Sequence, residues 1–255
     1  MRLLMDVQAY LDRIEYRGPL DPHFETLSQL HLAHLLRVPF ENLSIHFHEP
    51  IVLNNSALFE KIVTRRRGGF CYELNGLFGA LLRELGFEVA MLSAQVAGNQ
   101  NEFSRDFDHM TLRVGLNQQR WLADVGFGDS FIEPLPLVAN SEHQQRENRY
   151  RLVSDSHERL VLERALKDEA WQPQYRFAQQ PYQYSDYAEM CSYHQTSPES
   201  HFTRQRICSR LTPRGRISLS DMRLIVTEDG VRTERVLKND AECAEVLRQQ
   251  FGIEM

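Results

Sequence analysis

Residues 67–86 read Arg-Gly-Gly-Phe-Cys-Tyr-Glu-Leu-Asn-Gly-Leu-Phe-Gly-Ala-Leu-Leu-Arg-Glu-Leu-Gly, and this stretch decides the fold of the first third of the chain. Its leucine and phenylalanine side chains recur at helical spacing from Leu74 to Leu85. Gly86 stands where helices commonly end. The stretch therefore predicts an amphipathic helix with Cys71 in its first turn, entered through a tight glycine loop.

Two more helices are predicted upstream. One follows Asp21-Pro22-His23 and ends before Pro39, and the other starts at Asn54-Asn55-Ser56. From Phe87 to about Phe177 the pattern changes to short apolar runs separated by turns, which predicts an antiparallel sheet or barrel. The expected strands cover 89–96, 110–116, 121–127, 150–153 and 160–162, and the polar residues 143–148 are expected to form a solvated loop.

The last third is mixed. Residues 182–193 are compatible with a helix or with irregular structure. Strands are expected at 216–219, 223–227 and 231–237, with Glu228-Asp229-Gly230 as a hairpin turn. Asn239 and Glu242 resemble a capping box, which predicts a C-terminal amphipathic helix.

Composition narrows the class of protein. The chain has 255 residues, a net charge of −6 and 42% hydrophobic residues. A mildly acidic protein of this kind is not expected to bind nucleic acid, and ordinary apolar content predicts a globular fold. No apolar run is long enough for a membrane span and the N-terminus lacks a signal-peptide core, so a cytoplasmic location is expected. The four cysteines have no zinc-ligand spacing, so neither a metal site nor a disulfide framework is predicted.

Cys71 has the setting of a reactive thiol. It opens the predicted helix, where the helix dipole favours an anion, and three arginines precede the glycine pair. Both effects are expected to favour the nucleophilic thiolate. Its register with Leu74 and Phe78 points the side chain inward, so the alternative is an inert buried cysteine. That alternative is kept for Cys191, Cys208 and Cys243.

His109 and Asp124 are the expected partners of Cys71. His109 begins one predicted strand and Asp124 lies on the returning strand. If the turn near Asn117-Gln118 has an even number of residues, the two side chains share one face as direct or diagonal neighbours. An unpaired carboxylate in an apolar strand is costly, which favours an imidazole partner. The alternative is that Asp124 caps a turn or binds backbone amides.

Several segments together resemble the arylamine N-acetyltransferase family. They are Arg67–Asn75, Asp108-His109, Asp124-Val125-Gly126-Phe127-Gly128, Pro39-Phe40-Glu41-Asn42-Leu43 and Gln195-Thr196-Ser197-Pro198. The resemblance covers nearly the whole chain in the expected order. It implies an α+β fold with a cysteine-protease-like catalytic core: an N-terminal helical bundle (1–86) carrying the cysteine, a central antiparallel β-barrel (87–187) carrying histidine and aspartate, and a C-terminal α/β lid (188–255).

The resemblance also implies an activity. Cys71 matches the acetylated nucleophile, His109 the base, and Asp124 the residue that orients the base. The reaction would move an acetyl group from acetyl-coenzyme A, a co-substrate and not a tightly bound cofactor, to an arylamine, arylhydrazine or N-hydroxyarylamine by a ping-pong mechanism. Tyr193 matches a position that contacts coenzyme A, and Phe127 matches one that lines the acceptor pocket.

Further expectations concern the surroundings of this site. Phe70, Phe127 and Phe131 are expected to form an apolar acceptor pocket. Glu41 and Arg67 are expected to pair and hold the Cys71 loop. Glu199 stands where some members have a small hydroxyl residue and the chain ends at Met255, earlier than many members, so the mode of coenzyme A binding stays open.

Three alternatives share the same residues. A macrolactam-forming amide synthase belongs to the same family, and a thiol hydrolase uses the same Cys-His-Asp set. In a non-catalytic member the three residues would serve structure alone. The physiological amine, the acyl-chain preference and the oligomeric state are not indicated by the sequence.

Overall fold

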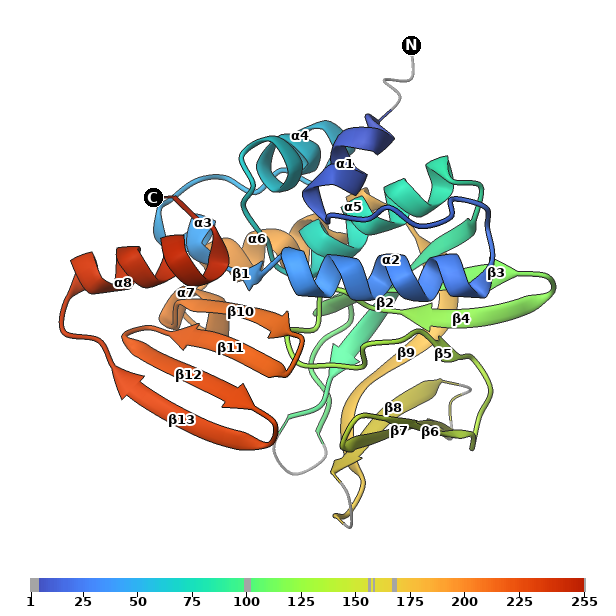
Figure 1. The fold of residues 1–255 in the computed structure, drawn as a ribbon. Helices are drawn as coiled ribbons and strands as arrows, with labels where there is room; N and C mark the ends of the chain where they lie inside the picture. Colours follow the sequence, from blue (N-terminus) through green and yellow to red (C-terminus); the bar gives the residue numbers. More distant parts are fainter. Residues whose placement is uncertain (1–4, 99–101, 156, 158, 167–168, 255) are drawn as a thin grey trace.

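A computed structural model of the chain describes residues 5–98, 102–155, 157, 159–166 and 169–254 (Figure 1). Its first part is helical. The helices are α1 (Val7–Arg13), α2 (Phe24–Arg37), α3 (Leu43–His46), α4 (Asn55–Phe59) with a π-helical continuation η1 (Glu60–Thr64), and α5 (Cys71–Glu84). The predicted start signal is confirmed at α4, where the Asn54 side chain accepts a hydrogen bond from the Ala57 N–H at 2.9 Å. The predicted end of α5 is confirmed at Gly86, whose φ is +90°.

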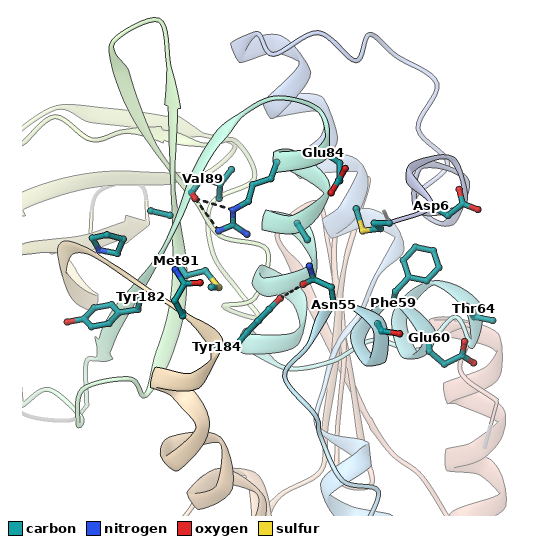
Figure 2. A pocket seen from close by; sticks show the side chains of 17 residues that line it. Asp6, Asn55, Phe59, Glu60, Thr64, Glu84, Val89, Met91, Tyr182 and Tyr184 are labelled. Carbon is teal, nitrogen blue, oxygen red and sulfur yellow. Dashed lines mark hydrogen bonds between the residues drawn. The ribbon is translucent and has the colours of Figure 1, made fainter. Parts of the chain in front are cut away.

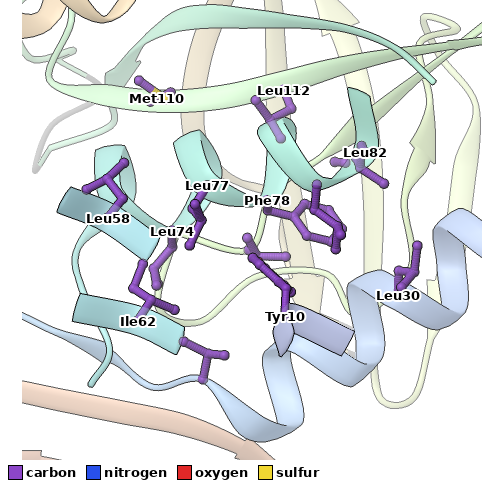
Figure 3. Close-up of a cluster of buried hydrophobic side chains, with 14 of the residues drawn as sticks. Tyr10, Leu30, Leu58, Ile62, Leu74, Leu77, Phe78, Leu82, Met110 and Leu112 are labelled. Carbon is purple, nitrogen blue, oxygen red and sulfur yellow. The ribbon is translucent and has the colours of Figure 1, made fainter. Parts of the chain in front are cut away.

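The apolar face of α5 forms the centre of the largest core. Leu74, Leu77, Phe78 and Leu82 are fully buried there. Figure 3 shows them between the side chains of other helices and those of strand β3. On one side lie residues of the other helices, and on the other lie Met110 and Leu112 of strand β3. Burying this face stabilises α5 against both layers at once, which fixes the position of its first residue, Cys71.

Eight antiparallel strands form the central layer, which curves into a nearly closed barrel. They are β2 (Glu88–Val96), β3 (His109–Leu116), β4 (Gln119–Ala123), β5 (Leu135–Pro136), β6 (Glu142–Gln145), β7 (Asn148–Ser154), β8 (Leu160–Leu166) and β9 (Gln172–Tyr182), in the spatial order β5-β4-β3-β2-β9-β8-β7-β6. The barrel interior is filled by buried side chains such as Leu92, Leu122 and Tyr175. The prediction of a loop at 143–148 is wrong. Residues 143–145 belong to β6, a strand at the edge of the sheet, where polar side chains are tolerated.

A five-stranded antiparallel sheet forms the third layer. Its strands are β1 (Phe40–Glu41), β10 (Ile207–Thr212), β11 (Gly215–Ser220), β12 (Arg223–Glu228) and β13 (Val231–Val236), in that order. The intervening and flanking helices are η3 (Tyr184–Tyr187), α6 (Ala188–Thr196), α7 (His201–Arg204), α8 (Asp240–Val246) and η4 (Leu247–Phe251). Asp229 and Gly230 both have positive φ, as a tight hairpin requires, and Asn239 caps α8. The predicted α+β fold is confirmed.

The β3–β4 hairpin determines where His109 and Asp124 lie. Leu116 pairs with Gln119, so Asn117 and Gln118 form the two-residue turn that the strand-parity argument required. The expected strand 121–127 is too long, however, because β4 ends at Ala123. Beyond it, the backbone N–H groups of Asp124 and Val125 bind side chains of α2 and α5 instead of a neighbouring strand. The result is a loop that bends toward the helices.

Among the described residues, no helix is long and apolar enough to cross a membrane.

Candidate active site

Cys71 is the first residue of α5 and its side chain is 2% exposed. The helix start is fixed by Glu73, whose carboxylate accepts a hydrogen bond from the Phe70 N–H at 3.1 Å. The Glu73 carboxylate also binds the Lys61 ammonium at 2.8 Å, so its own charge is compensated inside the protein. Cys71 therefore stands on a rigid element whose start is held by buried charges.

The expected acidity of Cys71 is not confirmed. Burial raises the pKa of the Cys71 thiol well above its ordinary value, and the carboxylates of Asp108 and Asp124 act in the same direction. The backbone N–H of Met110 acts against them but does not outweigh them. The three arginines do not help, because Arg67 pairs with Glu41 at 3.0 Å while Arg65 and Arg66 are exposed. A lone thiolate is thus disfavoured, and ionisation of Cys71 requires a nearby proton acceptor.

His109 and Asp124 form the predicted pair. The His109 Nε2 atom lies 2.7 Å from Asp124 Oδ2, and both side chains are buried. Burial alone would raise the pKa of Asp124, but His109 and hydrogen bonds from Asn75 and Gly126 outweigh it and hold that pKa below its ordinary value. Asp124 therefore stays ionised and accepts a proton-bearing Nε2, which leaves Nδ1 of His109 for proton transfer.

Asn75 joins the elements that carry these three residues. It lies one helical turn after Cys71 and is fully buried. Its Nδ2 donates to the Met110 carbonyl at 2.6 Å and to Asp124 Oδ1 at 2.8 Å, and its Oδ1 accepts from the Val125 N–H at 2.9 Å. The sequence analysis missed this residue, although its position in the Cys-Tyr-Glu-Leu-Asn run placed it on the same helix face as Cys71.

Cys71 and His109 line one cavity of about 1150 Å³. Its walls come from α5, the end of β2, the start of β3, the loop after β4, α6 and α7, and the inner face of the C-terminal sheet. Phe127 and Tyr193 line this cavity, as does Glu199, so three of the residues singled out in the sequence face the same space. Asp124 lies behind His109, not on the cavity surface.

The other predicted aromatic residues lie elsewhere. Phe70 is fully buried behind the cavity wall and contacts the rings of Tyr72 and Phe202. Phe131 is also fully buried and stacks on the His31 ring. In their place, Phe40 and Phe202 supply apolar surface to the cavity. No local pattern marks either residue as a cavity wall, because distant segments bring them there.

Glu41 and Arg67 form the predicted ion pair. Both side chains are at most 5% exposed, and Glu41 also accepts a hydrogen bond from the Leu43 N–H at 2.7 Å. The Glu41 N–H in turn donates to the Gly69 carbonyl. The pair therefore connects the glycine loop before Cys71 to the edge of the C-terminal sheet.

A second cavity, of about 820 Å³, lies between α4, the end of α5, the start of β2 and residues 181–184 (Figure 2). Phe59, Met91, Tyr182 and Tyr184 are among its walls, and Tyr184 donates a hydrogen bond to Asn55 across it. Neither Cys71 nor His109 lines it. The candidate chemistry therefore belongs to the first cavity.

The remaining cysteines have no comparable setting. Cys191, Cys208 and Cys243 are buried free thiols, and burial raises the pKa of each. The described part of the chain holds no cluster of three or more histidine, cysteine or acidic side chains that could bind a metal ion.

Comparison with known proteins finds relatives over nearly the whole chain. The family model described as N-acetyltransferase matches residues 23–255. The arylamine N-acetyltransferase of Escherichia coli K12 is 34% identical over 96% of this chain and 87% of its own length. The arylamine N-acetyltransferase / N-hydroxyarylamine O-acetyltransferase of Salmonella typhimurium is 34% identical over 97% of this chain and 88% of its own. The structure of Mycobacterium marinum arylamine N-acetyltransferase in complex with CoA superposes with a TM-score of 0.90, at 33% identity over 97% of this chain and 93% of that one.

A family model that spans nine-tenths of the sequence, and full-length relatives with the same fold, lead to one conclusion: the chain belongs to the arylamine N-acetyltransferase family and is an acyltransferase.

Proposed function

We propose that the protein moves an acetyl group from acetyl-coenzyme A to the nitrogen of an arylamine, arylhydrazine or N-hydroxyarylamine, through acetyl-Cys71. One observation carries the proposal. His109 and Cys71 line a single cavity, Asp124 binds His109 from behind, and Nδ1 is the nitrogen of His109 that Asp124 leaves available.

In the first step the Cys71 proton passes to His109 as the sulfur attacks the thioester carbonyl of the donor. The raised pKa of the thiol supports this coupling, because a charged pair forms where a lone thiolate would not. The bond between the acetyl carbon and the coenzyme A sulfur then breaks. The departing thiolate takes the proton from His109, and acetyl-Cys71 remains.

In the second step the amine nitrogen attacks acetyl-Cys71. His109 accepts the proton that the nitrogen loses, the C–S bond to Cys71 breaks, and the Cys71 sulfur recovers a proton from His109. Asp124 holds the imidazole and stabilises its charged form in both steps. The backbone N–H groups of Cys71 and Tyr72, the first two residues of α5, are the proposed donors to the oxyanion, because those of Glu73 and Leu74 already donate to the Phe70 carbonyl.

The cavity favours an aromatic amine. Phe40, Phe127 and Phe202 give it apolar walls, and such walls disfavour a hydrated alkylammonium ion. Aromatic amines are neutral near neutral pH and bring a free lone pair to the thioester. The donor is anionic, and Arg204 lines the cavity, where its guanidinium donates a hydrogen bond to the Ser200 carbonyl and forms no ion pair with a carboxylate of the described residues. It is the proposed counter-charge that offsets Glu199.

The test separates transfer from hydrolysis. Purified enzyme is given acetyl-coenzyme A with and without 4-methoxyaniline, and free thiol and acetylated amine are measured together. We expect thiol release to rise with amine concentration and to match amide formation one for one. Amine-independent release at the same rate would favour a thiol hydrolase, and transfer only from longer acyl donors would favour an amide synthase.

Two variants complete the test. Cys71→Ala is expected to abolish transfer, whereas Cys191→Ala is expected to retain it. Cys191 is the matched control because it is also a buried free thiol but does not line the cavity. Equal losses in the two variants would contradict the role of Cys71.

A further inference from the structure

His31 binds the loop that follows β4 at two separate points, Asp124 and Ile132. It lies on α2, is fully buried, and is separated from its two contacts by 93 and 101 residues of sequence. Its Nε2 accepts a hydrogen bond from the Asp124 N–H at 3.1 Å. Its Nδ1 lies 3.0 Å from the Ile132 carbonyl oxygen. One imidazole thus connects the first and the ninth residue of the segment 124–132.

The two contacts specify one form of the ring. A carbonyl oxygen only accepts, so Nδ1 carries the proton, and a backbone N–H only donates, so Nε2 must present its lone pair. A protonated ring would direct an N–H against the Asp124 N–H. Burial lowers the pKa of His31 to about 4, which agrees with a neutral ring. Unlike His109, His31 is therefore a fixed donor and acceptor.

The ring has little freedom to turn. It stacks on Phe131 with ring centroids 5.6 Å apart and planes 8° apart, and its edge contacts Phe78 of α5. Phe131 belongs to the same loop, so the loop is held to α2 by two hydrogen bonds and one ring contact. The titratable groups that face His31 are Asp124 on the loop and His34 on α2.

The segment 124–132 carries two residues of the proposed reaction. Asp124 orients His109, and Phe127 lines the cavity next to the His109 ring, at a centroid distance of 5.1 Å. Asn75 binds the carboxylate of Asp124, whereas His31 binds its backbone. We propose that His31 is a positioning residue for acetyl transfer, which sets the Asp124 backbone so that its carboxylate meets His109. This inference rests on the proposed function of Cys71, His109 and Asp124.

Substitutions at His31 and His34 test the proposal. His31→Phe keeps an aromatic ring against Phe131 but removes both hydrogen bonds. His31→Gln retains one acceptor and one donor and can restore both contacts. His34→Phe is the matched control, because His34 is an equally buried imidazole one turn along α2. It binds the Tyr10 hydroxyl at 2.8 Å and makes no hydrogen bond or ring contact with residues 124–132.

The readout is the single-turnover rate constant for Cys71 acetylation, measured across pH and normalised to the amount of Cys71 that becomes acetylated. His31→Phe is expected to lower it on the order of 10²-fold, as misplacement of a catalytic group by about 1 Å does. Its pH profile should also differ from that of the wild type, because a displaced Asp124 carboxylate no longer meets His109 in the same orientation. His31→Gln should recover most of the rate, and His34→Phe should lower thermal stability while retaining the wild-type rate constant and pH profile.

The opposite results would overturn the proposal. These are a wild-type rate constant and pH profile in His31→Phe, an equal rate loss in His34→Phe, or a glutamine variant no better than the phenylalanine variant. If His31→Phe does not fold, NMR spectra of the wild-type protein labelled with ¹⁵N-histidine test the proposal instead. An Nδ1-protonated ring that does not titrate near neutral pH supports the proposal, and a ring titrating near its ordinary pKa overturns it. Failure of the proposed function itself is distinguishable, because wild-type Cys71 would then not become acetylated.

Discussion

Gly126 packs so closely on Cys71 that a Cβ atom at position 126 would lie 2.8 Å from the Cys71 Cα and 3.0 Å from its carbonyl oxygen. The loop after β4 therefore rests directly on the backbone of the nucleophile. The same Cβ would lie 2.7 Å from Asn75 Nδ2, which is itself held by hydrogen bonds. Two rigid neighbours leave no room for a side chain.

Gly126→Ala is accordingly expected to displace the loop from α5. Overpacking of this kind costs about 1–3 kcal/mol of unfolding free energy, and the displacement should also slow Cys71 acetylation. Gly79→Ala is the control, because its Cβ would meet the nearest side-chain atoms at 3.4 Å, an ordinary contact, and alanine favours the helix. Chemical denaturation and single-turnover acetylation measure both effects. Unchanged acetylation in Gly126→Ala would contradict the close packing.

The acetylation rate is expected to depend more on the charge of the side chain at position 75 than on its size. Asn75→Ala leaves the Met110 carbonyl, the Asp124 carboxylate and the Val125 N–H each short of a partner, at about 1–3 kcal/mol per buried group. Asn75→Asp instead places a second carboxylate beside Asp124.

The aspartate variant should therefore lose more acetylation activity than the alanine variant at neutral pH, and the gap should narrow as pH falls and the carboxylates share a proton. Acetylation rates of the two variants across pH measure this. A gap that is independent of pH would show that shape, not charge, decides the role of this residue.

The sequence predicted the elements that local patterns specify. The α5 helix follows from the spacing of Leu74, Leu77 and Phe78, and the His109–Asp124 pair follows from a two-residue turn and strand parity. What it could not predict depends on partners far along the chain. The end of β4 is set by His31 and Asn75, which take up the N–H groups of residues 124 and 125.

The electrostatic environment of Cys71 also depends on partners that are distant in sequence. Three preceding arginines suggested a positive field, yet the fold pairs Arg67 with Glu41 and leaves the other two exposed. Whether a charge acts on a neighbour in sequence depends on which partner the tertiary structure gives it. Phe70 illustrates this for apolar residues, since it is adjacent to Cys71 but lies behind the cavity wall.

Glu41→Gln is expected to act on stability and not on chemistry. Glu41 is fully buried with Arg67, so loss of its charge leaves the guanidinium buried without a full counter-charge, at about 3–5 kcal/mol. Glu49→Gln is the control, because the side chain of Glu49 is 39% exposed and its pairs with Arg65 and Arg67 should contribute less than about 1 kcal/mol. Thermal unfolding and acetylation per active site measure the two effects separately. A loss of rate with unchanged melting in Glu41→Gln would argue against a structural pair.

Acid should destabilise the protein partly through His31. Its pKa is about 4 in the folded protein and about 6.5 in the unfolded chain, so the unfolded chain binds the proton first as pH falls. The stabilisation is therefore complete above about pH 6.5 and is lost as pH falls toward 4, by roughly 3 kcal/mol in total. Urea unfolding of wild type and His31→Phe over this range should show the difference between them shrinking with acidification. A constant difference would mean that His31 does not stay neutral in the folded protein.

The most direct test of the account is the state of Cys71 after the donor alone is added. Enzyme mixed with acetyl-coenzyme A, without amine, is quenched in acid and digested, and the peptides are analysed by mass spectrometry. The account predicts one acetyl group on the Cys71 peptide, lost on addition of an arylamine and absent from His109→Ala and Asp124→Ala at the same reaction time. An unmodified Cys71 in an enzyme that still transfers acetyl groups, or an acetyl group on another residue that turns over, would contradict it.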